Sequence, residues 1–92
     1  MEHCFLLFGV YDMKCKGREH LVTSADVSAG AIVLNFANET SGGGAVVQVR
    51  TAAGVTKAWD GAVSVSNSGA VTINNAGSVD WVDTDVVTVI AF

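Results

Sequence analysis

The stretch AVSVSNSGAVTIN, residues 62–74, decides the fold. Apolar and polar side chains alternate strictly in its first and last five residues, which is the period of a β-strand that buries one face. The connection between them ends in Gly69, which suits the positive φ of a three-residue hairpin loop. The stretch therefore predicts an antiparallel hairpin in which the residues of Val63–Val65 and Val71–Ile73 are paired and buried.

Strand-like patterns continue on both sides of this hairpin. Three upstream runs and one downstream run have this character: residues 31–37, with Ile32, Leu34 and Phe36 on one face; 45–51, with Val47 and Val49 inward; 55–59; and 86–92. The last run lacks alternation at its start, which predicts a central strand covered on both faces. About six to seven short strands with regular turn signals and no helical period indicate an all-β chain, a small antiparallel β-sandwich (Ig-like) or barrel.

Two turns resemble each other. Residues 23–27 and 82–86 both place a hydroxyl and an aspartate just before an apolar strand. Because Thr and Asp side chains accept hydrogen bonds from nearby backbone N–H groups, both segments predict capped turns. We expect the two turns to lie at the same end of the sandwich.

Composition divides the chain near residue 20. Both cysteines, both methionines, both histidines and the only tyrosine precede Leu21. We therefore predict an atypical N-terminal arm over residues 1–20 and a β-sandwich domain over residues 21–92. In the arm, Phe5, Leu6 and Phe8 are expected to pack on the sheet or on a neighbouring subunit.

The charge of the chain argues against several classes of partner. The net charge is −4, and Arg50 and Lys57 are the only cations after residue 20, so we expect no nucleic-acid partner. No apolar run approaches the ~20 residues of a membrane helix, so no membrane partner is expected. Glu2 precedes the apolar run 5–11 where a signal peptide would carry a cation. We therefore expect no export signal, synthesis in a cytoplasm and reduced thiols.

Apolar residues exceed what a small domain needs. Half of the residues are hydrophobic and 15% are charged, against about 25% in typical proteins. Few charges lie within the predicted strands, so their edges are poorly protected against pairing with other strands. These features favour a homo-oligomer, and the alternative is a compact monomer with a Ser-, Thr- and Asn-rich surface.

The chemistry of the side chains does not predict catalysis or a cofactor. After His20 the chain has no His, Cys or Tyr, so it offers no base near neutral pH. Asp80, Asp83 and Asp85 could supply oxygen ligands to Ca²⁺, but they lack the glycine and the closing glutamate of a calcium loop, and we assign no metal. The cysteines Cys4 and Cys15 are too far apart for the usual zinc pair with His3 and His20.

Two tryptophans allow two interpretations. Trp59 and Trp81 each lie next to a turn, where an aromatic ring could present a platform to a sugar. A large ring beside a turn more often covers a small core. With Phe5, Leu6 and Phe8, these two residues are the candidate interaction residues of the chain.

The segments 23–30, 45–57 and 85–91 resemble small virion proteins of tailed bacteriophages. These families are β-sandwich structural proteins of the decoration, cement or head-fibre kind. The similarity covers about residues 22–92 and consists of strand and turn patterns. The first 20 residues do not match.

The resemblance implies a non-enzymatic structural protein located in the virion and made in the host bacterial cytoplasm. Such a protein would associate with copies of itself and attach to a neighbouring capsid or tail protein. The alternative is an Ig-like carbohydrate-binding or adhesion module of a bacterial surface protein, which would use Trp59 or Trp81.

Overall fold

The computed structural model describes the backbone of residues 3–5, 12–40 and 43–92, and the side chains of residues 15–37, 39–40 and 43–92. In chain order the elements are β1 His3–Phe5, β2 Asp12–Lys14, β3 Lys16–Leu21, α1 Ser24–Ala29, β4 Ala31–Asn35, the 3-10 helix η1 Ala37–Glu39, β5 Ala45–Arg50, β6 Thr56–Lys57, β7 Ala62–Val65, β8 Ala70–Asn74 and β9 Val86–Ala91. None of the helices in the described residues is long and apolar enough to cross a bilayer.

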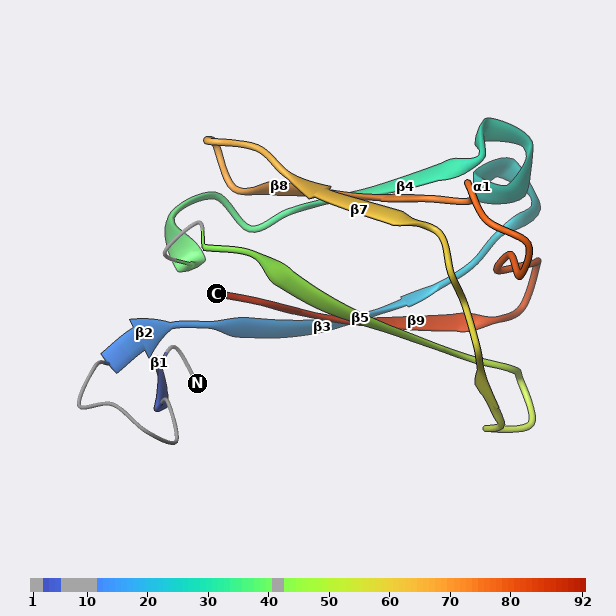
Figure 1. The fold of residues 1–92 in the computed structure, drawn as a ribbon, viewed down its shortest axis with the longest axis horizontal. Helices are drawn as coiled ribbons and strands as arrows, with labels where there is room; N and C mark the ends of the chain where they lie inside the picture. Colours follow the sequence, from blue (N-terminus) through green and yellow to red (C-terminus); the bar gives the residue numbers. More distant parts are fainter. Residues whose placement is uncertain (1–2, 6–11, 41–42) are drawn as a thin grey trace.

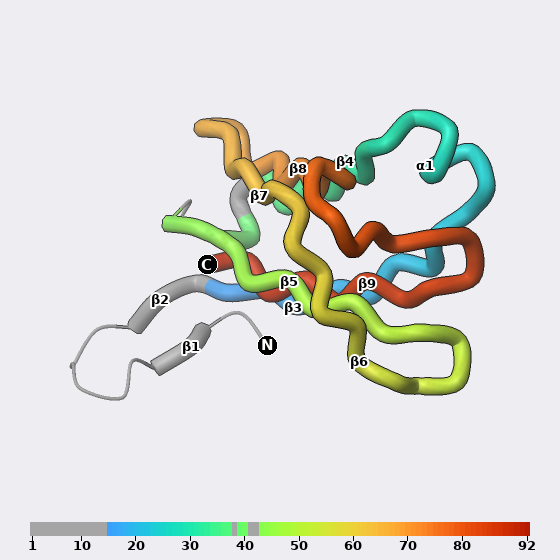
Figure 2. The backbone as a smooth tube through the Cα atoms, turned by 45° about the vertical axis from the view of Figure 1, so that its right-hand side comes forward, coloured from blue at the N-terminus to red at the C-terminus, as the bar shows by residue number. Residues whose placement is uncertain are grey.

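The chain forms a small all-β sandwich (Figure 1). One layer is a four-stranded sheet in the order β3-β9-β5-β6, and the other is a three-stranded sheet in the order β4-β8-β7. Every described strand pair is antiparallel. The segment between β6 and β7 crosses from one layer to the other, which Figure 2 shows in yellow. The β1–β2 hairpin is a separate two-stranded unit.

Apolar side chains from both layers fill the space between the sheets. The largest fully buried side chains are Trp81, Phe36, Ile73, Val22, Val49, Val71, Val87 and Val89. Ile32 and Phe36 lie on the predicted face of β4 and its extension, and Val49 points inward from β5 as predicted. Apolar residues alternate along each strand and so lie on the inner face of its sheet. The two inner faces pack together and form the core.

The hairpin of residues 62–74 is confirmed, with one correction. Val63 lies opposite Ile73 and Val65 opposite Val71, and Gly69 has a φ of +85°. A side chain at Gly69 would also collide with the backbone of Ala37. Both the positive φ and this close approach therefore favour glycine at this position. Val63, predicted to be buried, is 37% exposed, because β7 is an edge strand with no neighbour on its far side.

The prediction for the C-terminal strand is half right. β9 is central, with β3 on one side and β5 on the other. Its two faces differ, however: Val87 and Val89 are fully buried, whereas Ile90 is 45% exposed. A sandwich covers only the inner face of each sheet, so the expectation of cover on both faces is wrong.

The two similar turns lie at the same end of the sandwich, as predicted. The Asp26 carboxylate accepts the N–H of Thr23 at 3.0 Å, and the Asp85 carboxylate accepts the N–H of Val82 at 2.9 Å. Both turns adjoin the end of the β3–β9 ladder, where the N–H of Val22 donates to the carbonyl of Asp85.

The first of these turns continues into a helix that the sequence pattern did not predict. Thr23 and Asp26 form a reciprocal capping box at the start of α1, and Gly30 ends it with a φ of +73°. The helix is six residues long. A segment this short cannot display a helical period, so only its caps could have indicated it.

The predicted boundary between residues 20 and 21 falls inside β3. All six residues of this strand, Lys16–Leu21, pair with β9, so the sandwich includes the last five residues of the predicted arm. The charged residues of β3 concealed the strand, because they occupy the face that alternation would make apolar. Cys15, immediately before this strand, is buried and disulfide-bonded, which corrects the expectation of reduced thiols for this residue.

Candidate interaction surface

The outer face of the four-stranded sheet exposes large aliphatic side chains. Leu21 on β3 is 62% exposed, Val46 on β5 is 59% exposed and Ile90 on β9 is 45% exposed. Because side chains alternate between the two faces of a sheet, these residues point away from the core and toward solvent. We call Leu21, Val46 and Ile90 the outer-face cluster.

Two members of the outer-face cluster are direct cross-strand neighbours. Val46 lies opposite Ile90 on the adjacent strand, and Gly17 lies opposite Ile90 on its other side. Gly17 has no side chain, so the flank of Ile90 toward β3 is uncovered. A β-branched pair on a rigid sheet gives a preorganised apolar surface, which loses little conformational entropy on binding.

An ion pair separates this apolar end of the face from Leu21. The Arg50 guanidinium donates to Glu19 Oε2 at 2.6 Å and reaches Thr88 Oγ1 at 3.5 Å. Glu19 lies opposite Thr88 on β9, whereas Arg50 lies opposite Val86, so the ion pair runs diagonally across β9. Because the ion pair is largely solvent-exposed, its contribution to the free energy of unfolding is small, about 0–1 kcal/mol.

The edge strand β3 closes one side of the sandwich with charged residues. Arg18 donates to Glu39 Oε1 at 2.7 Å, and Lys16 Nζ lies 3.8 Å from Glu39 Oε2. The Arg18 guanidinium also lies 4.5 Å from the centroid of the Phe36 ring, in a cation–π contact. Charges that point inward from an edge strand discourage pairing with other strands, so this edge is better protected than predicted.

His20 extends this charged side toward α1. Its Nε2 lies 2.8 Å from Asp26 Oδ2. The hydrogen bond from His20, and then the backbone N–H of Thr23, lower the pKa of the Asp26 carboxyl from its usual value of 3.8. Asp26 thus caps α1 and holds the helix against β3 with the same carboxylate.

Trp59 is half-buried between the two layers. Its indole N–H donates to Asn75 Oδ1 at 3.2 Å, and a side chain at Gly61 would collide with its ring. The ring therefore packs where the chain enters β7. Only part of the predicted aromatic platform remains accessible at this residue.

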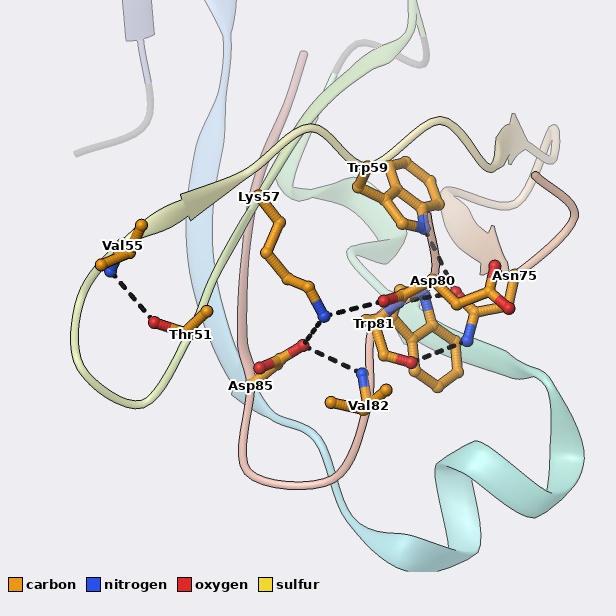
Figure 3. A network of polar contacts seen from close by, with 9 residues as sticks. All are labelled: Thr51, Val55, Lys57, Trp59, Asn75, Asp80, Trp81, Val82 and Asp85. Atoms are coloured by element: carbon orange, nitrogen blue, oxygen red, sulfur yellow. Dashed lines mark hydrogen bonds and ion pairs between the residues drawn. The ribbon is translucent and has the colours of Figure 1, made fainter. Parts of the chain in front are cut away.

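Trp81 lies in the core, as the favoured of the two interpretations predicted. Its side chain is fully buried, so its ring has no surface to present to a sugar or a partner. Asn75 fixes its backbone: the N–H of Trp81 donates to Asn75 Oδ1 at 3.0 Å, and Asn75 Nδ2 donates to the Trp81 carbonyl at 2.9 Å (Figure 3). One asparagine thus holds both tryptophans.

Lys57 and Asp85 form the most deeply buried ion pair among the described residues. Lys57 Nζ lies 2.8 Å from Asp85 Oδ2 and donates to the carbonyl of Asp80 at 2.9 Å (Figure 3). The Asp85 side chain is 5% exposed and that of Lys57 is 21% exposed. This network connects β6 to the segment that precedes β9.

The three aspartates do not converge on a cation site. Asp85 turns inward to Lys57, whereas Asp80 and Asp83 are exposed. No group of three potential metal ligands occurs among the described residues.

Asp60, which the sequence analysis did not single out, accepts the N–H of Val79 at 2.8 Å. Backbone hydrogen bonds from Val79 and Ser78 lower the pKa of its carboxyl.

The remaining predicted contact residues lie outside the described part of the chain. They are the side chain of Phe5 and the whole of Leu6 and Phe8. The side chains of His3 and Cys4, which were considered as zinc ligands, also lie outside the described residues. The sequence analysis missed Asn75 and the Lys57–Asp85 pair. Lys57 and Asp85 are 28 residues apart and come from different segments, so their pairing gives no local spacing signal.

Comparison with protein-family models, with curated proteins and with solved structures finds no match.

Proposed function

We propose that this chain is a non-enzymatic structural protein of a tailed-phage virion, which self-associates and attaches to a neighbouring capsid or tail protein. The observation that carries the proposal is the outer-face cluster, Leu21, Val46 and Ile90, each 45% or more exposed on the four-stranded sheet. The phage setting comes from the resemblance of the strand and turn patterns.

Physical chemistry supports an assembly role for this surface. Burying apolar area contributes roughly 25 cal/mol per Å², and a specific interface takes about 800 Å² from each partner. A rigid sheet face presents its apolar side chains without reorganising, which lowers the entropy cost of binding. Weak contacts repeated around a capsid or tail would act together through multivalency.

The composition of virions tests this role. Mass spectrometry of purified virions, from the phage that encodes the chain, should detect it in many copies per particle. Virions that assemble without detectable amounts of the chain would overturn the proposal. If the purified chain instead bound glycans in a manner abolished by Trp59→Ala, the carbohydrate-binding alternative would replace it.

A further inference from the structure

The free edge of β7 differs from the charged side of the sandwich. β7, residues Ala62–Val65, contains no charged residue, and Ala62, Val63 and Ser64 are all exposed. The opposite side of the sandwich carries the ion pairs of Lys16 and Arg18 with Glu39. A second copy that covered that side would have to remove these charged groups from water, whereas the β7 edge carries no such penalty.

The backbone of β7 is ready to accept another strand. Ser66 donates its N–H to the carbonyl of Ala70, so the backbone N–H and C=O groups of Ser66 point toward β8. In an antiparallel ladder the backbone groups of successive residues point alternately to the two neighbouring strands. The N–H and C=O groups of Ser64 therefore also point toward β8, and those of Val63 and Val65 point to the free edge. An edge with unpaired backbone groups, no proline and no charge is a template for strand addition.

The sequence of β7 selects its own copy as the added strand. Residues 62–66 read AVSVS, which is nearly symmetric about Ser64. In a two-fold antiparallel pairing centred there, Ser64 faces Ser64 of the second copy and Val63 faces Val65. Apolar side chains then meet apolar ones on one face and hydroxyls meet on the other, and Val63 is covered.

We propose that β7 pairs with β7 of a second copy in this register, joining two three-stranded sheets into one continuous six-stranded sheet. The proposal deepens the self-association proposed above and rests on it. The ladder would contain four intermolecular hydrogen bonds, two for each Val63–Val65 pair. Its small area suits a contact that is repeated in an assembly and is weak in isolation.

Cysteine cross-linking tests the register directly. In a non-hydrogen-bonded antiparallel pair the Cα atoms are about 4.5 Å apart, which is within the range of a disulfide. The full chain carrying Ser64→Cys, oxidised at about 100 µM and analysed on a non-reducing gel, should form a covalent dimer. The matched control Ser66→Cys should not, because residue 66 would face residue 62 of the partner.

A charge at the same position gives a second readout. Ser64→Lys places two lysines opposite each other, which should weaken self-association about 2–5-fold. Ser68→Lys, in the loop beyond the ladder, should leave self-association unchanged. Circular dichroism checks that both variants fold. Equal cross-linking at positions 64 and 66, or association unchanged by Ser64→Lys while the unmodified chain self-associates, would overturn the β7 pairing alone. An unmodified chain that stays monomeric would overturn the proposed self-association as well.

Discussion

Lys57 on β6 and Asp85 before β9 form an ion pair of 2.8 Å that links a two-residue edge strand to the turn at one end of the sandwich. Asp85 also accepts the N–H of Val82 at 2.9 Å, so one carboxylate orders both segments. β6 is too short to be held by its ladder alone. The ion pair therefore adds a second connection between β6, which precedes the crossing segment, and the turn before β9.

Removing one partner of this pair should destabilise the fold more than removing both. Asp85→Asn leaves the Lys57 ammonium largely buried without its counter-charge, which should lower the free energy of unfolding by about 3 kcal/mol. The double variant Lys57→Met with Asp85→Asn should recover part of this loss. Urea denaturation of the single and double variants measures the coupling; additive effects would show that the pair does not interact.

Ile73 on the inner face of one sheet and Ile90 on the outer face of the other allow a comparison of core and surface substitutions. Ile73 is fully buried, so Ile73→Ala should cost about 2–4 kcal/mol of unfolding free energy. Ile90 is 45% exposed, and Ile90→Ala should cost less than about 1 kcal/mol in the monomer. Chemical denaturation at low protein concentration compares them. Equal losses would mean that the two faces of the sheets are assigned incorrectly.

Acid should weaken the junction between β3 and α1. The hydrogen bond from His20 lowers the pKa of Asp26 in the folded state below its usual value of 3.8. Stability from this carboxylate is therefore present above the unfolded pKa and is lost as the pH falls through the folded pKa. Asp26→Asn should be less stable at neutral pH, and its stability should decline less below pH ~4. A parallel decline in both proteins would show that Asp26 does not contribute.

Two deletions distinguish the predicted arm from the strand that the structure shows. Removal of residues 1–14 leaves β3 intact, whereas removal of residues 1–20 takes five of its six residues from the β9 ladder. Under reducing conditions we expect the shorter deletion to fold and the longer one to lose cooperative thermal unfolding. If residues 21–92 alone melted like the full chain, β3 would be dispensable and the original boundary would be correct.

The fold was predictable where alternation is strict, and the interaction surface was not. The 62–74 hairpin and the central place of β9 follow from local patterns, because pairing and turn chemistry act over a few residues. β3 escaped prediction because Lys16, Arg18 and His20 occupy its inner face and find partners on other elements. The role of Asn75 was not predicted because its partners also come from other segments. Its side chain bonds to Trp59 and Trp81, which lie next to it only in the folded chain.

Sedimentation at high salt distinguishes self-association through apolar surface from association through ion pairs. At about 1 M NaCl the Debye length is near 3 Å, so contacts that depend on ion pairs weaken whereas apolar ones persist. At about 100 µM the unmodified chain should sediment as an oligomer in this salt. A variant carrying Val46→Lys and Ile90→Lys should shift toward monomer, because charges on the outer face oppose its burial in a contact. An unmodified chain that sediments as a monomer under these conditions would show that the chain does not self-associate through apolar surface.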